Sequence, residues 1–543
     1  MRDNRTTSRI MTLLALAGLF FFISLGSFDL TNPDEVFYAQ TAKEMAAGNS
    51  WMTPYMFGQP QFEKPILTYW LIRIGYLLFG VNAFGARFFC ALFATAGVLG
   101  VYFLGLLGFR DERKAFLSAL VCMSAIFYMA LARTVFTDMF FTVFIALSLT
   151  AFYWAYACPE RKRPGILLFF VFSGLAVLTK GPLGAAIPFA AALAFVLLMR
   201  MPGFLLDPVF AAGLALCAAI SVPWYAFIIG RHGDAFIREF FYNDHYRRLI
   251  YAEHRSNDRW YFYPLTMIGC MFPWSAFTAA ALGRLFKRIG EAKPFTLFCA
   301  CWIITVLAAF QFAHSKLTTY ILPLFPALAV VTADFISGNA SSRLLKNCFL
   351  ITLAVCAVIP VVLVAGITVF SGYLSSATPA YILILATGVF AWIFFSFIRR
   401  DKLSKAAYAL AGFNLIIILA LPFASRDVDR LASSREAGKC LNANGARGTV
   451  LCSKPFVRGV SYFSGLDTAF FDTGTFFSPH PVTYLSPADP PAVRAFLVRQ
   501  GITYCVLRSS GARQMKEIAG TDFRVEQLCV VGEQHVIKVS PST

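Results

Sequence analysis

The sequence predicts an α-helical, polytopic membrane protein with about thirteen transmembrane helices and an α/β domain at its C-terminus. Composition is the first reason: 58% of the 543 residues are hydrophobic, 14% are charged and the mean hydropathy is +0.65. Soluble globular proteins are about one quarter charged. The second reason is a series of apolar runs that approach the ~20 residues needed to cross a membrane. This composition excludes a disordered chain and disfavours a soluble enzyme.

Thirteen apolar runs account for the predicted helices. They cover residues 10–28, 84–107, 115–131, 139–157, 165–178, 183–199, 208–229, 263–282, 295–312, 317–336, 349–370, 380–397 and 406–423. The first run is not followed by a small-residue cleavage site before Asp29. We therefore expect it to be a retained anchor and not a cleaved signal peptide.

Basic residues in the short loops give the orientation. Cytoplasmic loops are enriched in lysine and arginine, and here such residues precede run one and return in every second loop. They are Arg2, Arg5, Arg9, Arg110, Arg113, Lys114, Arg161, Lys162, Arg163, Arg200, Arg284, Lys287, Arg288, Lys293, Arg343, Lys346, Arg399, Arg400, Lys402 and Lys405. We expect a cytoplasmic N-terminus, and an odd number of crossings then places the segment after residue 423 outside, in a bacterial periplasm. Membrane topology also explains the net charge of +18, so no nucleic-acid partner is expected.

Two outer connections, 29–83 and 230–259, are long enough to indicate a site. In the first, residues 32–46 predict a capped amphipathic helix lying on the membrane surface, and 66–79 predict a second short helix. Alternating segments at 448–452, 503–507 and 528–539, with a helix at 491–500, predict a small α/β domain. We expect a transmembrane catalytic domain at 1–424 and a periplasmic α/β domain at 425–543. The pairing of its cysteines, Cys440, Cys452, Cys505 and Cys529, stays open.

Ionisable residues gather at the outer ends of the runs. Because charge is costly in lipid, such residues are functional candidates, although any single one has the alternative of being a solvated loop charge. They are Asp34, Glu35, Glu63, Lys64, Arg133, Asp138, Lys180, His245, Arg247, Arg248, His254, His314 and Lys316. As a set they indicate a polar cavity at the outer face of the membrane.

The chemical mixture of this set favours one kind of reaction. The carboxylates Asp34 and Asp138 can orient an acceptor, hold a cationic group or bind a metal. The lysines Lys64, Lys180 and Lys316, with nearby arginines, can neutralise a phosphate. Carboxylates opposite phosphate-binding cations at a lipid interface favour transfer from a lipid-phosphate donor. A secondary transporter is the alternative, but the sequence shows no paired broken helices and almost no charge at mid-span.

Some of these residues have a structural explanation beside the functional one. Glu63, His245 and His254 can supply zinc ligands, but no helical His-x-x-x-His spacing supports such a site and satisfied loop histidines are commoner. Arg133 can pair with Asp138 or bind phosphate, and the sequence favours neither.

An ordered set of motifs carries a family resemblance. The motifs are Asn32-Pro33-Asp34-Glu35 with Tyr38, Phe62-Glu63-Lys64-Pro65, Arg133 with Asp138, Thr179-Lys180-Gly181, Pro223-Trp224, Asn243-Asp244-His245, and Ser315-Lys316 with Tyr320. From Asp29 to about Pro326 the chain resembles the lipid A aminoarabinose transferases, GT-C-type glycosyltransferases related to protein O-mannosyltransferases. Val36-Phe37 departs from the Gly-Arg-type pair of that family, which leaves the acceptor less defined than the donor.

The resemblance implies an inverting transfer of 4-amino-4-deoxy-L-arabinose from undecaprenyl phosphate to lipid A phosphates at the periplasmic face of the bacterial inner membrane. This modification gives resistance to polymyxin and other cationic peptides. The implied roles are catalysis for Asp34 and Asp138, donor-phosphate binding for Lys64, Arg247, Lys316, Tyr320 and Lys180, and acceptor or sugar contact for Glu35, Tyr38, Arg133 and Arg248. We expect a monomer in the bilayer with no required cofactor. Another sugar, or another acceptor such as a protein hydroxyl, is the alternative.

Overall fold

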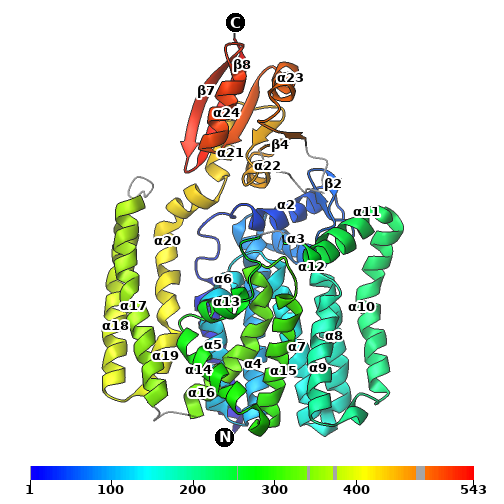
Figure 1. Cartoon of the computed structure of the whole chain (residues 1–543), viewed down its shortest axis with the longest axis vertical. Helices are drawn as coiled ribbons and strands as arrows, with labels where there is room; N and C mark the ends of the chain where they lie inside the picture. The colour runs from blue at the N-terminus through cyan, green and yellow to red at the C-terminus, as the bar shows by residue number, and fades with distance from the viewer. Residues whose placement is uncertain (1, 253–254, 339–342, 371–375, 473–482, 543) are drawn as a thin grey trace.

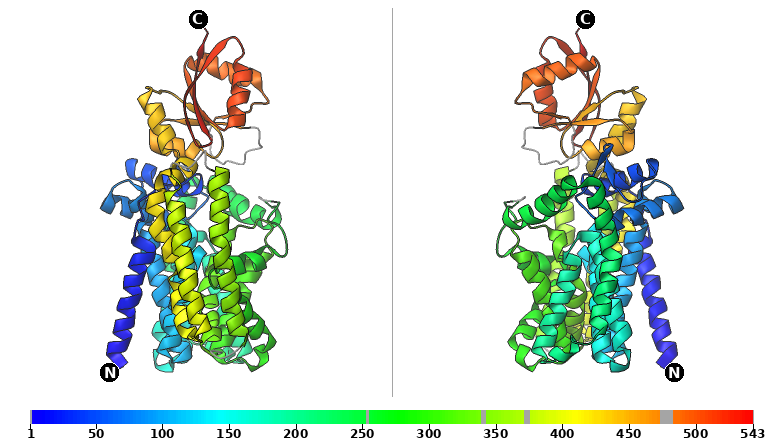
Figure 2. Two further views of the ribbon diagram at one scale, coloured as in Figure 1. Left: turned by 90° about the vertical axis from the view of Figure 1, so that its left-hand side faces the viewer. Right: turned by 90° about the vertical axis from the view of Figure 1, so that its right-hand side faces the viewer.

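The computed structural model describes residues 2–252, 255–338, 343–370, 376–472 and 483–542. A bundle of long helices carries a smaller α/β domain at one end (Figure 1). The N-terminus lies at the far end of the bundle and the C-terminus at the tip of the α/β domain (Figure 2). The predicted fold class, a helical membrane domain followed by an α/β domain, is confirmed.

Nine helical segments in the described part of the chain are long and apolar enough to cross a membrane. They are α4 (Ala83–Phe109), α7 (Thr137–Ala157), α8 (Lys162–Lys180) with its leading turn, α10 (Val209–His232), α15 (Pro294–Gln311), α16 (Phe325–Gly338) with the 3₁₀-helix η6 (Thr318–Leu324), α17 (Arg343–Phe370), α18 (Thr378–Arg399), and α19 (Leu403–Ala411) with α20 (Phe413–Ala432). A tenth results if α5 (Glu112–Ser124) and α6 (Ile126–Ala132), bent by 66°, form one span.

The other three apolar runs are helical but shorter or broken. α1 (Arg2–Ala17) passes into the π-helix η1 (Gly18–Phe22), and α9 is Leu183–Leu198. The run at 263–282 divides into α13 (Phe262–Cys270) and α14 (Ser275–Lys287) around Pro273, which has no N–H to continue a helix. Each of the thirteen runs is thus helical, whereas the number of membrane crossings stays a prediction.

Close packing of α7 against α8 places two charged residues side by side. A Cβ added to Gly165 would lie 2.8 Å from the Cβ of Ala155, so only glycine permits this approach. The two helices are antiparallel neighbours, and the first turn of α7 therefore meets the last turn of α8. Asp138 lies in the former and Lys180 in the latter.

Two long loops fold onto the end of the bundle that faces the α/β domain. One contains α2 (Asp34–Ala47), the hairpin of β1 (Tyr55–Met56) with β2 (Gln59–Pro60), and α3 (Leu67–Phe79). The other contains α11 (Asp234–Phe236), the π-helix η4 (Ile237–Arg247) and α12 (Arg248–Ile250). The expectation of an amphipathic helix lying on the membrane surface is wrong for α2, because most of its residues are buried inside the protein. The α/β domain covers α2 from above (Figure 1).

The α/β domain is built on a six-stranded mixed sheet with the strand order β5-β4-β3-β6-β8-β7. Its strands are β3 (Val450–Cys452), β4 (Thr468–Phe471), β5 (Tyr484–Leu485), β6 (Thr503–Leu507), β7 (Phe523–Val531) and β8 (Gln534–Pro541). Its helices are α21 (Arg435–Ala443), α22 (Val457–Ser464), α23 (Pro490–Gln500) and α24 (Ser509–Ala519). The strand character predicted at 528–539 is confirmed, but the segment contains two strands. Those residues belong to the antiparallel hairpin of β7 and β8, which turns at Gly532 with φ +57°.

The α/β domain is tied to the membrane domain by a continuous helix and is closed by a disulfide. α20 runs through the predicted domain boundary at residue 424 and ends at Ala432. Cys440 of α21 and Cys529 of β7 form a disulfide across 89 residues. Cys452 and Cys505 lie buried on the neighbouring strands β3 and β6 and carry free thiols.

Candidate active site

Helix α2 begins at exposed Asp34 and buries the next residue. Glu35 is fully buried, and its carboxylate pairs with the Arg87 guanidinium of α4 at 2.7 Å. It also accepts from the backbone N–H groups of Thr31 and Val135. Burial alone raises the pKa of Glu35, but Arg87 and these hydrogen bonds hold it below its usual range. The predicted contact of Glu35 with acceptor or sugar is therefore not supported, since its oxygens are engaged inside the protein. The pair instead fixes the start of α2, and so the position of Asp34.

Arg87→Ala is expected to destabilise the protein by about 3–5 kcal/mol, because it leaves the buried Glu35 carboxylate without its partner. Arg87 also donates to the carbonyl oxygens of Leu25, Phe28 and Asp29, and these bonds are lost as well. The lowered pKa of Glu35 means that this stabilisation is fully present above its ordinary pKa of 4.5 and is lost as pH falls through the lowered value.

The melting temperature of the purified protein in detergent at neutral pH measures this effect. Arg113→Ala, at an exposed arginine of α5, is the control and should melt like the wild type. Equal melting temperatures for Arg87→Ala and Arg113→Ala would contradict the anchoring role.

Arg133 follows α6 and lies buried against the first helix of the chain. Its guanidinium donates to the carbonyl oxygens of Phe20 at 3.1 Å and Ile23 at 2.7 Å. Carbonyl groups at a helix end lack intrahelical partners, so Arg133 satisfies the end of η1. Neither predicted partner, Asp138 or a phosphate, explains these contacts, and the predicted acceptor or sugar contact of Arg133 is not supported.

The first cluster of predicted site residues lies where α7, α8 and η6 meet. Asp138 and Lys180 form an ion pair and both are nearly buried. The Lys180 ammonium also lies 4.2 Å from the centroid of the Tyr320 ring, within reach of a cation–π interaction. The Tyr320 hydroxyl accepts a hydrogen bond from Arg248 at 3.4 Å. Four residues from distant parts of the sequence thus come together.

A second cluster joins the first loop to η4. Asp244 lies between two cations, with the Lys64 ammonium at 2.7 Å and the Arg248 guanidinium at 2.8 Å. Burial raises the pKa of Asp244, but the two cations outweigh it and hold the pKa below its usual range. Arg248 belongs to both clusters and therefore connects them. Arg247 is the last residue of η4, directly before Arg248.

Lys316 lies at the edge of this group and is bound to a carboxylate of its own. Asp258 accepts from the Lys316 ammonium at 2.6 Å and lies 2.7 Å from the Nδ1 atom of His314. Sequence reasoning missed Asp244 and Asp258 as partners. Asp244 lies inside the motif Asn243-Asp244-His245, and that motif was the signal available to find it.

Tyr38 of α2 lies among the site's carboxylates. It is buried, and its ring centroid is 6.2 Å from that of Tyr69 on α3. Burial raises the pKa of Tyr38 well above its ordinary value, and the negative charges of Asp138, Asp34 and Glu63 raise it further. Tyr38 is therefore a phenol that keeps its proton at physiological pH, and Asp34, Asp138 and Glu63 all lie close enough to act on it.

The zinc ligands predicted from the sequence are Glu63, His245 and His254. His245 Nδ1 lies 2.7 Å from the carbonyl oxygen of Phe240. Within the described ranges, no three His, Cys, Asp or Glu side chains are placed together as metal ligands. His254 lies outside the described residues. A zinc ion at Glu63 and His245 stays an untested prediction.

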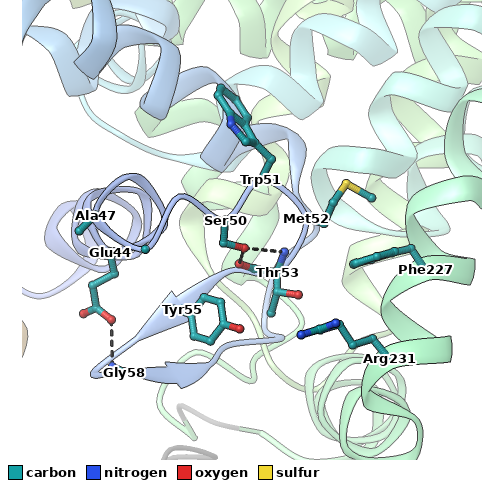
Figure 3. Close-up of a pocket in the computed structure, with 11 residues that line it drawn as sticks. Glu44, Ala47, Ser50, Trp51, Met52, Thr53, Tyr55, Gly58, Phe227 and Arg231 are labelled. Atoms are coloured by element: carbon teal, nitrogen blue, oxygen red, sulfur yellow. Dashed lines mark hydrogen bonds between the residues drawn. The ribbon is translucent and has the colours of Figure 1, made fainter.

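A cavity of about 560 Å³ opens between the end of α2, the β1–β2 hairpin and α10. Figure 3 shows Arg231 and Phe227 reaching from α10 toward Thr53 and Tyr55. At the opposite end of the bundle, a cavity of about 840 Å³ is lined by basic residues of the short loops, including Arg110, Arg284 and Arg288.

Known proteins resemble this chain in both sequence and fold. Residues 6–232 match the family model described as dolichyl-phosphate-mannose-protein mannosyltransferase. An uncharacterized protein of Aquifex aeolicus is 33% identical over 422 residues, which are 78% of this chain and 79% of that protein. The undecaprenyl phosphate-alpha-4-amino-4-deoxy-L-arabinose arabinosyl transferase of Pseudomonas aeruginosa (strain UCBPP-PA14) is 33% identical over 324 residues. The chain belongs to this family of membrane glycosyltransferases.

The match with the Pseudomonas arabinosyl transferase covers 59% of this chain and 58% of that enzyme, which is less than two thirds of its length. The fold likeness extends further. The crystal structure of ArnT from Cupriavidus metallidurans bound to undecaprenyl phosphate superposes with a TM-score of 0.78, 19% identity and 98% of both chains covered. The predicted GT-C fold is confirmed, and the secondary-transporter alternative is set aside because the transferase belongs to a glycosyltransferase family.

Proposed function

We propose that this transferase moves 4-amino-4-deoxy-L-arabinose from undecaprenyl phosphate to a phosphate group of lipid A, with inversion at the anomeric carbon. The observation that carries the proposal is the gathering of Lys64, Lys180 and Arg248 with the carboxylates Asp138 and Asp244 at the end of the bundle where Asp34 begins α2. The names of the arabinosyl transferases, from Pseudomonas aeruginosa and Erwinia tasmaniensis among others, support this sugar and this donor.

The cations act on the leaving group. The bond between the anomeric carbon and the donor phosphate oxygen breaks, and its electron pair stays on the phosphate. The departing undecaprenyl phosphate is then a monoester with a charge of about −1.5 to −2. Lys64 and Arg248 both contact the carboxylate of Asp244, which places two cations close together where they can neutralise a phosphate. Fixed cations at that point stabilise the charge that develops in the transition state.

The acceptor needs no general base. A lipid A phosphate is already anionic near neutral pH, and its oxygen attacks the anomeric carbon as the donor bond breaks. Asp34 therefore serves to stabilise positive charge on the sugar, either the oxocarbenium-like ring or the 4-ammonium group. Glu63 is a second candidate for the ammonium, because no cation among the described residues forms an ion pair with its carboxylate.

The proposed location is the periplasmic face of a bacterial inner membrane. The Cys440–Cys529 disulfide supports an oxidising compartment for the α/β domain and for the site beneath it. The basic loop residues line the opposite end of the bundle, as expected for a cytoplasmic side. Masking lipid A phosphates with a cationic sugar there lowers the attraction for polymyxin-like peptides. We propose that the transferase acts as a monomer.

Transfer by the purified protein tests this proposal. With undecaprenyl phosphate-linked aminoarabinose as donor, the transferase should add a pentosamine to lipid A and none to lipid A stripped of its phosphates. Transfer to a serine-containing peptide instead, or transfer of a different sugar only, would favour another member of the same family and contradict the proposal.

A further inference from the structure

The α/β domain packs against the start of α2 more closely than side chains normally allow. A Cβ added to Gly459 of α22 would lie 2.0 Å from the Oδ1 atom of Asn32, two residues before Asp34. The Asn32 amide also donates to the Ser434 hydroxyl at 2.8 Å. The segment that leads into Asp34 is thus held by the α/β domain itself.

Further contacts hold α22 in this place. The Lys43 ammonium of α2 donates to the carbonyl oxygen of Tyr462 at 2.7 Å, and the hydroxyls of Tyr76 and Tyr462 are 3.2 Å apart. α22 lies directly above α2 in Figure 1. Side chains of α22 that contact α2 are consequently close to the start of α2, as Arg458 is to Phe37.

One of these side chains is a guanidinium with unused donors. Arg458 precedes Gly459, is half-buried, and lies over the Phe37 ring at 4.7 Å from its centroid. Among the described residues, no carboxylate or carbonyl accepts a hydrogen bond from it, whereas an arginine has five N–H donors. Arg73 also lies over an aromatic ring, that of Trp51, but donates to Ser50 and Asn49 as well. Packing on Phe37 therefore leaves the N–H donors of Arg458 without an acceptor among the described residues.

We propose that Arg458 forms an anion-binding subsite at the junction of α22 and α2, and that it holds a phosphate group of the acceptor lipid. This proposal rests on the proposed function for the identity of the acceptor. Phe37 lies one turn after Asp34 on α2, and the positive charge of Arg458 also reaches Tyr69 at the wall of the site. A phosphate bound there would lie beside the sugar-binding carboxylates, and a guanidinium is well suited to a phosphate because it can donate two parallel hydrogen bonds. The α/β domain would then be part of the acceptor site.

Binding experiments with the full chain in nanodiscs test this subsite. The probes are lipid A and its dephosphorylated form. The wild type should bind the phosphorylated probe more tightly, Arg458→Gln should lose about 10- to 100-fold of that affinity, and Arg458→Lys should keep part of it. Arg499→Gln, at an exposed arginine of α23, is the matched control and should bind like the wild type. In all variants, affinity for undecaprenyl phosphate should stay unchanged.

The outcomes separate this subsite from the transfer reaction itself. Binding is measured without turnover, so a wild type that binds phosphorylated lipid A through Arg458 but transfers no aminoarabinose supports the subsite and contradicts the proposed function. Retained preference for the phosphorylated probe in Arg458→Gln would overturn the subsite. A lowered melting temperature in both Arg458→Gln and Arg458→Lys, with equal loss of binding, would also overturn it, because Arg458 would then act only by packing on Phe37.

Discussion

Asp34→Asn is expected to lower kcat/KM for sugar transfer by about 10²–10³-fold, the scale seen when one preorganised electrostatic group is removed from an active site. The substitution keeps the shape of the side chain and removes its charge. Asp34 is exposed at the start of α2, outside the buried Glu35–Arg87 pair, so the fold should be retained. The positive charge of the reacting sugar then loses the carboxylate that is proposed to stabilise it.

Steady-state transfer by the purified protein measures this change. Asp234→Asn, at an exposed carboxylate of α11 in the second long loop, is the matched control and should transfer like the wild type. Because the acceptor phosphate needs no general base, the rate should follow ionisation of the phosphate, whose second pKa is about 6. Full turnover by Asp34→Asn would remove Asp34 from the mechanism.

Lys64→Ala is expected to weaken donor binding and to lower kcat/KM by about 10²–10³-fold, as Asp34→Asn does. Lys64 is nearly buried and lies 2.7 Å from Asp244, so its ammonium is fixed in the second cluster before any donor arrives. Its removal takes one of the cations from the place where phosphate charge grows. Arg248 and Lys180 then remain to stabilise the leaving group.

Binding of undecaprenyl phosphate to the purified variants separates the donor effect from folding. Lys439→Ala, at an exposed lysine of α21, controls for loss of a surface charge and should bind normally. Asp244→Asn is informative in the opposite direction, because it frees Lys64 and Arg248 from their shared carboxylate and should not weaken binding of the phosphate. Normal affinity and turnover in Lys64→Ala would exclude Lys64 from the donor site.

The sequence predicted the fold class and many of the residues that meet, because both depend on local pattern and on topology. The thirteen apolar runs are helical, and the alternation of outer and inner ends places Asp138, Lys180 and Tyr320 at one end of the bundle. Their mutual distances follow from helix packing, such as the close approach at Gly165, which no local pattern contains.

The sequence pattern did not predict which residues far apart in the chain contact each other. Glu35 was expected to face a substrate, but its partner Arg87 lies 52 residues away, and only the packing of α4 against α2 reveals the pair. The sequence did contain a signal. Arg87 is a charged residue near the start of an apolar run, where an ionisable side chain needs a partner of opposite charge. The burial of α2 likewise depends on α22, which returns from more than 400 residues later in the chain.

Mass spectrometry of lipid A tests the central claim most directly. The transferase would be expressed in a Gram-negative strain that lacks its own aminoarabinose transferase, with Lys64→Ala produced in parallel. We predict a pentosamine on lipid A phosphates with the wild type and its loss with Lys64→Ala. Unmodified lipid A, in cells whose membranes contain the folded wild-type protein, would contradict the assignment of sugar and acceptor.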